Sequence, residues 1–205
     1  MKRKLNILGL LLCGTIAYAQ SFEAHMGASG ANAKSSGLSI DTFGDNTFYS
    51  SPSLDGTFMN IGASLMLTPH YGFGGELSFK PGKSDYAGLE YRPLFWDFNG
   101  IVHPITASKR LVPEIQGGLG GVNLRFYYPS AGCNVFAGCN SQNLYLQSSN
   151  HFQVHAGVGL AVFVTDHLFL QPKLDVHYVR DFFQFGTNWV PQYGINVGYR
   201  FGESH

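Results

Sequence analysis

The segment from Gln192 to Phe201 is the feature that most restricts the fold of this chain. Every odd position from Tyr193 to Phe201 is aromatic or aliphatic, whereas every even position from Gln192 to Arg200 is polar or glycine. Successive side chains of a strand point to opposite faces, so the segment has one apolar face and one small, polar face. A strand of this kind, ending close to the chain terminus on an aromatic residue, is typical of a membrane-spanning β-barrel, with lipid outside and the lumen inside.

The N-terminal segment is predicted to be a signal peptide (residues 1–19), followed by a single domain (residues 20–205). Residues 2–4 are basic, residues 5–16 form a short apolar run, and Ala17-Tyr18-Ala19 has the small residues of a cleavage site. A transmembrane helix needs about 20 apolar residues, so the short run argues against a retained membrane anchor.

The composition also favours a membrane barrel over a soluble β-sandwich. Charged residues make up 13% of the chain, against about 25% in typical soluble domains. Aromatic residues reach 15% and there are 26 glycines, which suits strands with a lipid-facing outside and a closely packed inside. Basic and acidic residues balance at 13 each, so nothing indicates binding to nucleic acid.

The same alternation, followed along the chain, predicts eight strands of about ten residues, the length that a tilted strand needs to cross a bilayer. The connections alternate between short and mostly longer, and an even number of strands puts both termini on the periplasmic side. We therefore predict an all-β, eight-stranded antiparallel transmembrane β-barrel with an up-and-down meander. The strands are expected at residues 21–29, 57–67, 71–80, 86–103, 111–128, 152–164, 168–178 and 192–201.

Two of these strands break the alternation if all their charged residues are to face the lumen. In residues 86–103, Glu90 and Arg92 share one face while Asp97 lies on the other, which requires a bulge near Pro93-Leu94. In residues 111–128, Glu114 and Arg125 conflict in the same way. The glycine-rich run 117–121 could absorb that shift, because glycine adopts bulge conformations at little steric cost.

With those bulges, the lumen collects charges of both signs, which must pair because an isolated buried charge is costly. An eight-stranded barrel is just wide enough for side chains to fill. We therefore expect a plug of paired charges, and the alternative is a gate that opens when pairs exchange partners. The predicted lumenal network is Glu76, Glu90, Arg92, Asp97, Glu114, Arg125, Lys173, Asp175 and Arg200.

A turn centred on Asp166 places His155 opposite His177 in the lumen. This pair could bind a metal or respond to protons, but a packed, hydrogen-bonded pair is the favoured interpretation. A zinc site normally needs a third ligand, and Asp175 lies about 6–7 Å along the strand from His177. We therefore assign no metal ligands and no cofactor.

Cys133 and Cys139 are the cysteines that remain after the predicted cleavage, and Gly and Asn flank them. Thiols of exported proteins rarely stay free, so this pair is expected to close a small disulfide loop. The five-residue gap fits neither a C-x-x-C redox motif nor a haem attachment motif, and no histidine lies within the loop to complete a zinc site.

On these features the chain resembles the small eight-stranded outer-membrane barrels, the group that includes the OmpA transmembrane domain, OmpX and OmpW. Tyr199 and Phe201 also resemble the C-terminal signal that the outer-membrane assembly machinery recognises. The resemblance implies a bacterial outer-membrane location, a monomeric barrel, and contact with outer-membrane lipids and with the assembly machinery.

The expected function is a structural or cell-surface interaction role with a largely plugged lumen, with a surface protein or a small solute as partner. One alternative is a narrow, OmpW-like channel for small or apolar solutes, with a path past Arg92, Arg125 and Arg200. A second alternative is a lipid-modifying enzyme. We assign no catalytic residues, because the chain contains no H-E-x-x-H, P-loop or G-x-S-x-G motif and no serine with an assignable catalytic partner.

Overall fold

A computed structural model describes residues 21–35, 37–105, 108–134, 138–182 and 185–202, without the side chains of residues 131–142. The predicted signal peptide, residues 1–19, lies outside the described residues. Within these ranges, no helix is long and apolar enough to cross a membrane.

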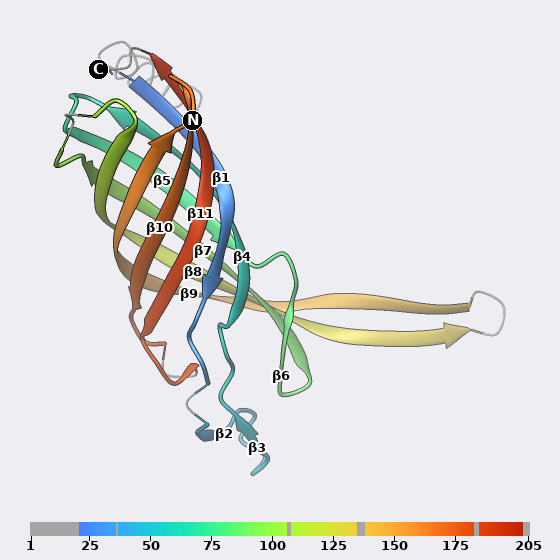
Figure 1. The fold of residues 1–205 in the computed structure, drawn as a ribbon. Helices are drawn as coiled ribbons and strands as arrows, with labels where there is room; N and C mark the ends of the chain where they lie inside the picture. Colours follow the sequence, from blue (N-terminus) through green and yellow to red (C-terminus); the bar gives the residue numbers. More distant parts are fainter. Residues whose placement is uncertain (1–20, 36, 106–107, 135–137, 183–184, 203–205) are drawn as a thin grey trace, which may run out of the picture.

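The described chain folds into a closed antiparallel barrel (Figure 1). Each strand pairs with the next along the barrel wall, and β1 closes it by pairing with both β4 and β11. Within the described residues, the eight strands of the wall are β1 (Ser21–Ala31), β4 (Gly56–Met66), β5 (Tyr71–Phe79), β7 (Leu89–Val102), β8 (Leu111–Asn134), β9 (Gly138–Phe163), β10 (Leu168–Val179) and β11 (Trp189–Gly202). The predicted fold class and the meander order are confirmed.

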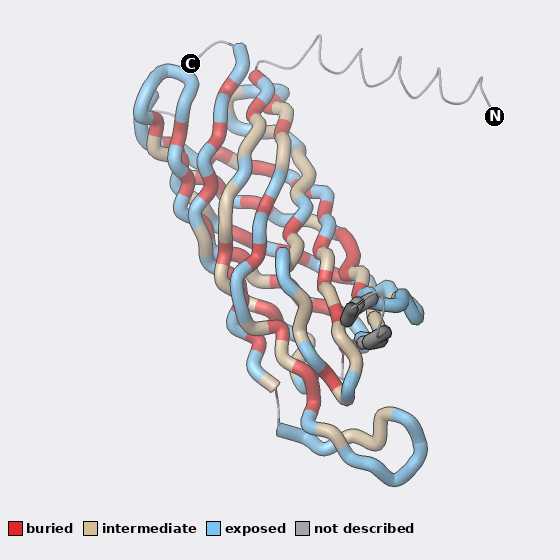
Figure 2. Tube along the Cα trace, turned by 90° about the vertical axis from the view of Figure 1, so that its right-hand side faces the viewer, coloured by how far each residue is buried: buried red, intermediate tan, exposed pale blue. Residues whose placement is uncertain are grey.

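Buried and exposed residues alternate along the wall strands (Figure 2). In β11, Gln192, Asn196 and Arg200 are buried inside the barrel, whereas Tyr193 and Phe201 are exposed outside. The outer surface is a band of large apolar side chains, which a lipid environment would cover.

The two ends of the barrel differ. Ser21 and Gly202, the first and last described residues, are register partners at one end of the barrel. The short connections from β4 to β5 and from β9 to β10 lie at the same end. The longer connections lie at the opposite end. In outer-membrane barrels the short turns face the periplasm and the longer loops face the outside, which gives the orientation used below.

The outer connections contain further strand structure. β2 (Ser39–Asp41) and β3 (Phe48–Ser50) form a small hairpin between β1 and β4, and β6 (Ser84–Tyr86) pairs with β7. The prediction of a loop at residues 129–150 is wrong for most of that range. β8 and β9 continue through it as a paired hairpin. Because β8 and β9 satisfy each other's backbone hydrogen bonds, they can continue as a hairpin beyond the bilayer.

The two predicted bulges are also wrong. The register between β7 and β8 runs without a break from Glu90 opposite Tyr127 to Val102 opposite Ile115. The register shift in this part of the wall lies instead between β8 and β9, at Phe126 and Tyr127.

Candidate functional site

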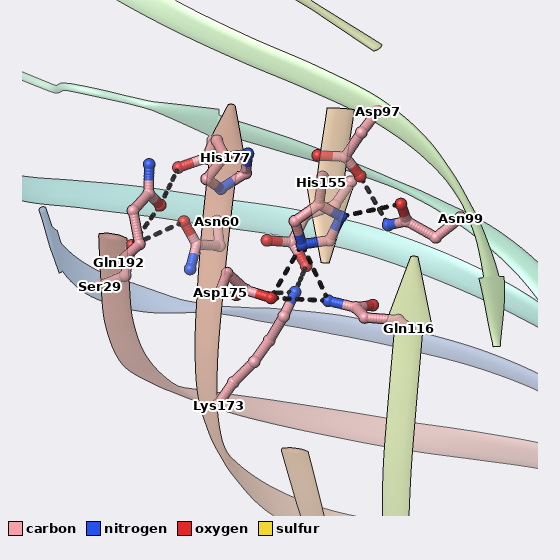
Figure 3. A network of polar contacts seen from close by, with 12 residues as sticks. Ser29, Asn60, Asp97, Asn99, Gln116, His155, Lys173, Asp175, His177 and Gln192 are labelled. Atoms are coloured by element: carbon pink, nitrogen blue, oxygen red, sulfur yellow. Dashed lines mark hydrogen bonds and ion pairs between the residues drawn. The ribbon is translucent and has the colours of Figure 1, made fainter. Parts of the chain in front are cut away.

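The middle of the barrel interior is a layer of connected polar side chains (Figure 3). The Nζ atom of Lys173 donates to Oε2 of Glu76 at 2.6 Å and lies 3.3 Å from Oδ2 of Asp175. Nε2 of His25 is 3.1 Å from the same oxygen of Glu76. Because these side chains are largely withdrawn from water, pairing of opposite charges is needed to offset the cost of their burial.

His155 on β9 links this ion-pair cluster to the opposite wall. Its Nε2 lies 2.9 Å from Oδ1 of Asp175, and its Nδ1 lies 3.0 Å from Oδ1 of Asn99. Gln116 donates from Nε2 to the same Oδ1 of Asp175 at 2.9 Å, and Asn99 donates from Nδ2 to Asp97 at 2.6 Å. The hydrogen bonds therefore cross the barrel from β10 to β7.

The glycines of the inner face make room for this layer. Asp175 lies opposite Gly157 in the register, and a Cβ atom on Gly157 would lie 2.0 Å from the Asp175 carboxylate. His25 lies opposite Gly62 in the same way, with its Nε2 2.4 Å from where a Cβ would be. Long polar side chains thus fold over positions that have no side chain, which explains the glycines on the lumenal face.

The predicted histidine pair is placed as the Asp166-centred turn requires. His155 lies directly opposite His177, and their rings stack with centroids 4.7 Å apart. Nδ1 of His177 lies 3.1 Å from Oε1 of Gln153. Asp175 contacts His155 across the strands rather than its own strand neighbour His177. Among the described residues, no group of three or more His, Cys, Asp or Glu is arranged to hold a metal ion.

A second group of ion pairs lies toward the periplasmic end. Arg200 donates from Nε to Oε1 of Glu23 at 2.6 Å, and its guanidinium group lies 4.2 Å from the ring centroid of Phe163. Nε2 of His103 lies 3.4 Å from Oε2 of Glu114. Arg200 and Glu114 are both buried inside the barrel.

The polar layer leaves little free space. The cavity beside Glu76 and Lys173 has a volume of about 10 Å³. That is room for about one water molecule.

An apolar cluster fills the extracellular half of the interior, and the sequence analysis did not predict it. Phe58 and Phe95 meet edge to face with ring centroids 5.8 Å apart, and the ring of Tyr91 lies 5.7 Å from that of Phe185. The cluster consists of Ala31, Ala33, Leu54, Phe58, Tyr86, Tyr91, Phe95, Val122, Leu124, Val179, Phe182, Phe185 and Val190. On the strands, the signal was a change from polar to apolar residues on the inward-facing positions near the extracellular ends.

The loops complete this apolar cluster. Phe182 and Phe185, from the connection after β10, stack with ring centroids 4.4 Å apart. The Tyr91 hydroxyl donates to the Ser53 carbonyl of the first loop. Lys80 donates to the carbonyl of Asp55 at 2.8 Å and to the hydroxyl of Ser84, which ties the first two loops together, and partial burial lowers the pKa of Lys80.

The prediction that Glu90, Arg92 and Arg125 face the lumen is wrong. Because the strands contain no bulge here, the alternation places these residues on the same outward face as Trp96 and the other apolar residues of the outer surface. Glu90 pairs with Lys83 at 2.6 Å on the outside of the barrel. Outward charges are tolerated here because β7 and β8 extend past the apolar band, so no bulge is needed to hide them. A solute path lined by Arg92 and Arg125 is excluded for the same reason.

The predicted disulfide concerns side chains outside the described ones. The backbone register places Cys133 directly opposite Cys139 near the tip of the β8–β9 hairpin. The disulfide itself stays a prediction.

The C-terminal aromatic residues face outward at the periplasmic end of β11. The ring centroids of Tyr199 and Phe201 are 4.6 Å apart, and Phe201 lies 5.7 Å from Phe22 on the neighbouring strand. Recognition of these residues by the assembly machinery stays a prediction.

Several solved structures have a similar fold. OprG from Pseudomonas aeruginosa aligns with a TM-score of 0.57 and 13% identity, covering 91% of this chain and 98% of OprG. Neisserial surface protein A aligns with a TM-score of 0.54 and 14% identity, covering 89% and 97%. Ail of Yersinia pestis, solved with the heparin analogue sucrose octasulfate, aligns with a TM-score of 0.52 and 12% identity, covering 88% and 98%.

No curated protein matches the sequence significantly. Residues 6–201 match the family described as the outer membrane protein beta-barrel domain. That match spans nearly the whole chain and agrees with the closed barrel, its apolar outer face and its polar interior. The protein therefore belongs to the outer-membrane β-barrel family and resides in the bacterial outer membrane.

Proposed function

We propose that the protein is a non-conducting surface protein, in which the barrel is a membrane anchor and the outer loops contact a partner. The observation that carries this proposal is the filled interior. Ion pairs occupy the periplasmic end and the middle, and an apolar cluster occupies the extracellular half. Within the described residues, a filled interior of this kind would block a hydrated solute.

The β8–β9 hairpin is the best-exposed surface for a partner. It extends away from the barrel wall (Figure 1), and its described side chains include large apolar groups in solvent. Tyr128, Leu144, Tyr145 and Leu146 are each more than half exposed. Exposed apolar groups gathered on one element are typical of protein interaction sites.

The proposal also holds that the protein is not an enzyme. The charged side chains in the middle of the described interior are engaged with one another, as in the contacts of Lys173 with Glu76 and Asp175. Lipid A extracted from cells with and without the protein is expected to have the same mass profile, and a new lipid A species would contradict this part.

A cell-surface binding experiment tests the interaction role. Cells that display the intact protein are compared with cells that display a variant shortened between Tyr127 and Tyr145, which are register partners at the base of the hairpin. Binding to immobilised extracellular matrix proteins, to a sulfated polysaccharide and to cells of the same strain is measured. The sulfated polysaccharide is included because Ail was solved with a heparin analogue.

We expect the intact protein to increase adhesion to at least one of these surfaces and the shortened variant to lose that increase. A matched control carries Phe43→Ser in the first loop, where an exposed aromatic is removed and the hairpin is left intact. Equal adhesion of cells with and without the intact protein on every surface would contradict the interaction role.

A further inference from the structure

The outer face of the barrel carries a pair of arginines that take no part in the packing of the interior. Arg92 on β7 lies directly opposite Arg125 on β8, and both side chains leave the outer side of the wall. Cβ atoms of directly opposed residues lie about 4.5–5.5 Å apart, and like charges in such a pair repel. The fold therefore places two cationic residues at directly opposed positions of the outer face, where an anion between them would relieve their repulsion.

The protein supplies no such anion to these arginines. Arg125 donates from Nε to Oδ1 of Asn123 at 3.1 Å. Arg92 donates from Nε to the Lys80 carbonyl at 2.9 Å and from Nη2 to the Pro81 carbonyl at 2.8 Å. Among the described residues, no carboxylate forms an ion pair with either guanidinium group.

The height of the pair above the membrane follows from the outward-facing rows below it. The next row holds Asn123 and Asn150, joined by a 2.7 Å hydrogen bond. One row further down, the ring of Trp96 lies over Gly121, and Phe152 is its outward neighbour. Tryptophan marks the membrane interface, and Arg92 lies about 13 Å along the strand from Trp96. The arginines are thus at the level of lipid headgroups rather than of acyl chains.

The β8–β9 hairpin overhangs the same position. Figure 1 shows it leaving the barrel sideways. A strand pair that bends away from the barrel axis turns its outward face toward the membrane. Tyr127 and Tyr145 form a ring pair on it, with centroids 6.1 Å apart. The Lys83 ammonium lies 4.6 Å over the Tyr127 ring at this corner.

Acidic groups on this face do not cancel the two arginines. Glu90 is paired with Lys83 at 2.6 Å, and Asp85 is opposite Glu90, further from the membrane. The corner between wall and hairpin is therefore cationic on its lower side. Arginine forms bidentate hydrogen bonds with phosphate oxygens, which makes phosphate a well-matched ligand.

We propose that Arg92 and Arg125 bind a phosphate group of a phosphorylated lipid in the outer leaflet. The acyl chains of that lipid lie along the apolar wall below Trp96. A lipid fits better than a soluble anion because the site is one pleated row above the Asn123 row and is continuous with the lipid-facing band.

The test uses the full mature barrel, refolded in a neutral detergent and titrated with bisphosphorylated lipid A or with chemically dephosphorylated lipid A. Bound lipid is counted by native mass spectrometry. We expect the wild-type protein to bind the phosphorylated lipid about tenfold more tightly than the dephosphorylated one, and Arg125→Gln to abolish this preference. Arg92→Lys keeps the charge but loses the bidentate geometry and is expected to retain part of the preference.

Arg180→Gln is the control, because Arg180 is an exposed arginine beyond the end of β10 whose Nε already lies 3.4 Å from a carboxylate oxygen of Asp181. We expect it to bind phosphorylated lipid A as the wild type does. Thermal unfolding separates binding from a structural role. Without lipid, Arg125→Gln should be as stable as the wild type or more so, and phosphorylated lipid should stabilise only the wild type.

Two results would overturn the proposal. One is equal preference for phosphorylated lipid A in the wild type and in Arg125→Gln. The other is binding of inorganic phosphate or of a sulfated sugar as tight as that of phosphorylated lipid A, which would assign the corner to a soluble anion. Both readouts are independent of conductance and adhesion, so they do not depend on the proposed function.

Discussion

Inside the barrel, several polar side chains fold over a glycine on a neighbouring strand. Asp175 folds over Gly157, and Asn99 folds over Gly118, where a Cβ atom would lie 2.2 Å from Oδ1 of Asn99. Gly157 and Gly118 are therefore part of the polar layer, because they leave the space that these side chains occupy.

The variant Gly157→Ala is expected to destabilise the barrel by about 1–3 kcal/mol, because the added Cβ overlaps Asp175 and strains its bonds to His155 and Gln116. Urea unfolding of the refolded protein in detergent micelles measures the loss. Gly117→Ala is the matched control. Its added Cβ would come no closer than 3.6 Å to the His155 carbonyl oxygen, so its effect should be small. Equal losses for the two variants would contradict the account.

The variant Lys173→Met is expected to cost about 3–5 kcal/mol of unfolding free energy, because it leaves the buried carboxylates of Glu76 and Asp175 without their cation. Adding Glu76→Gln and Asp175→Asn to the same variant should recover part of this loss. The same unfolding experiment compares the single and triple variants. A single variant as stable as the wild type would show that the ion pairs do not hold the interior together.

At the scale of single elements, alternation predicted the strands well where they cross the bilayer. The turn centred on Asp166 gave the correct register, with His155 opposite His177. The assignment of faces failed where strands continue past the bilayer, because both faces of a strand can carry polar groups there. Glu90, Arg92 and Arg125 were placed inside on the assumption that every charge of a wall strand must avoid lipid.

The tip of the β8–β9 hairpin lies away from the barrel wall (Figure 1) and carries the opposed cysteines. We predict that Cys133 and Cys139 are disulfide-bonded in the exported protein. The protein is treated with an alkylating agent and its intact mass is measured. No label should be added without reductant, and two labels should be added with reductant, one on each cysteine. Labelling without reductant would show free thiols. The Cys133→Ser and Cys139→Ser double variant should still form the heat-resistant, compact barrel on a gel, because the hairpin tip lies outside the wall.

At the scale of the whole molecule, the interior is stacked in layers. Ion pairs of Arg200 lie at the periplasmic end, the Lys173 network lies in the middle, and the apolar cluster around Phe58 and Phe95 lies at the extracellular end. A filled lumen could be predicted from the barrel width. The apolar cluster that fills its extracellular half could not be predicted from the sequence. Phe182 and Phe185 come from a connection, and alternation gives no direction to side chains outside strands.

Single-channel conductance of the refolded wild-type protein in a planar bilayer tests the closed interior most directly. The variant with Phe58→Ala and Phe95→Ala, which removes two fully buried rings from the apolar cluster, serves as the comparison. We expect no current steps from the wild type, which should migrate as a compact barrel on an unheated gel, and more frequent current steps from the variant. Steady, reproducible openings of the wild-type protein would contradict the closed interior and indicate a solute channel.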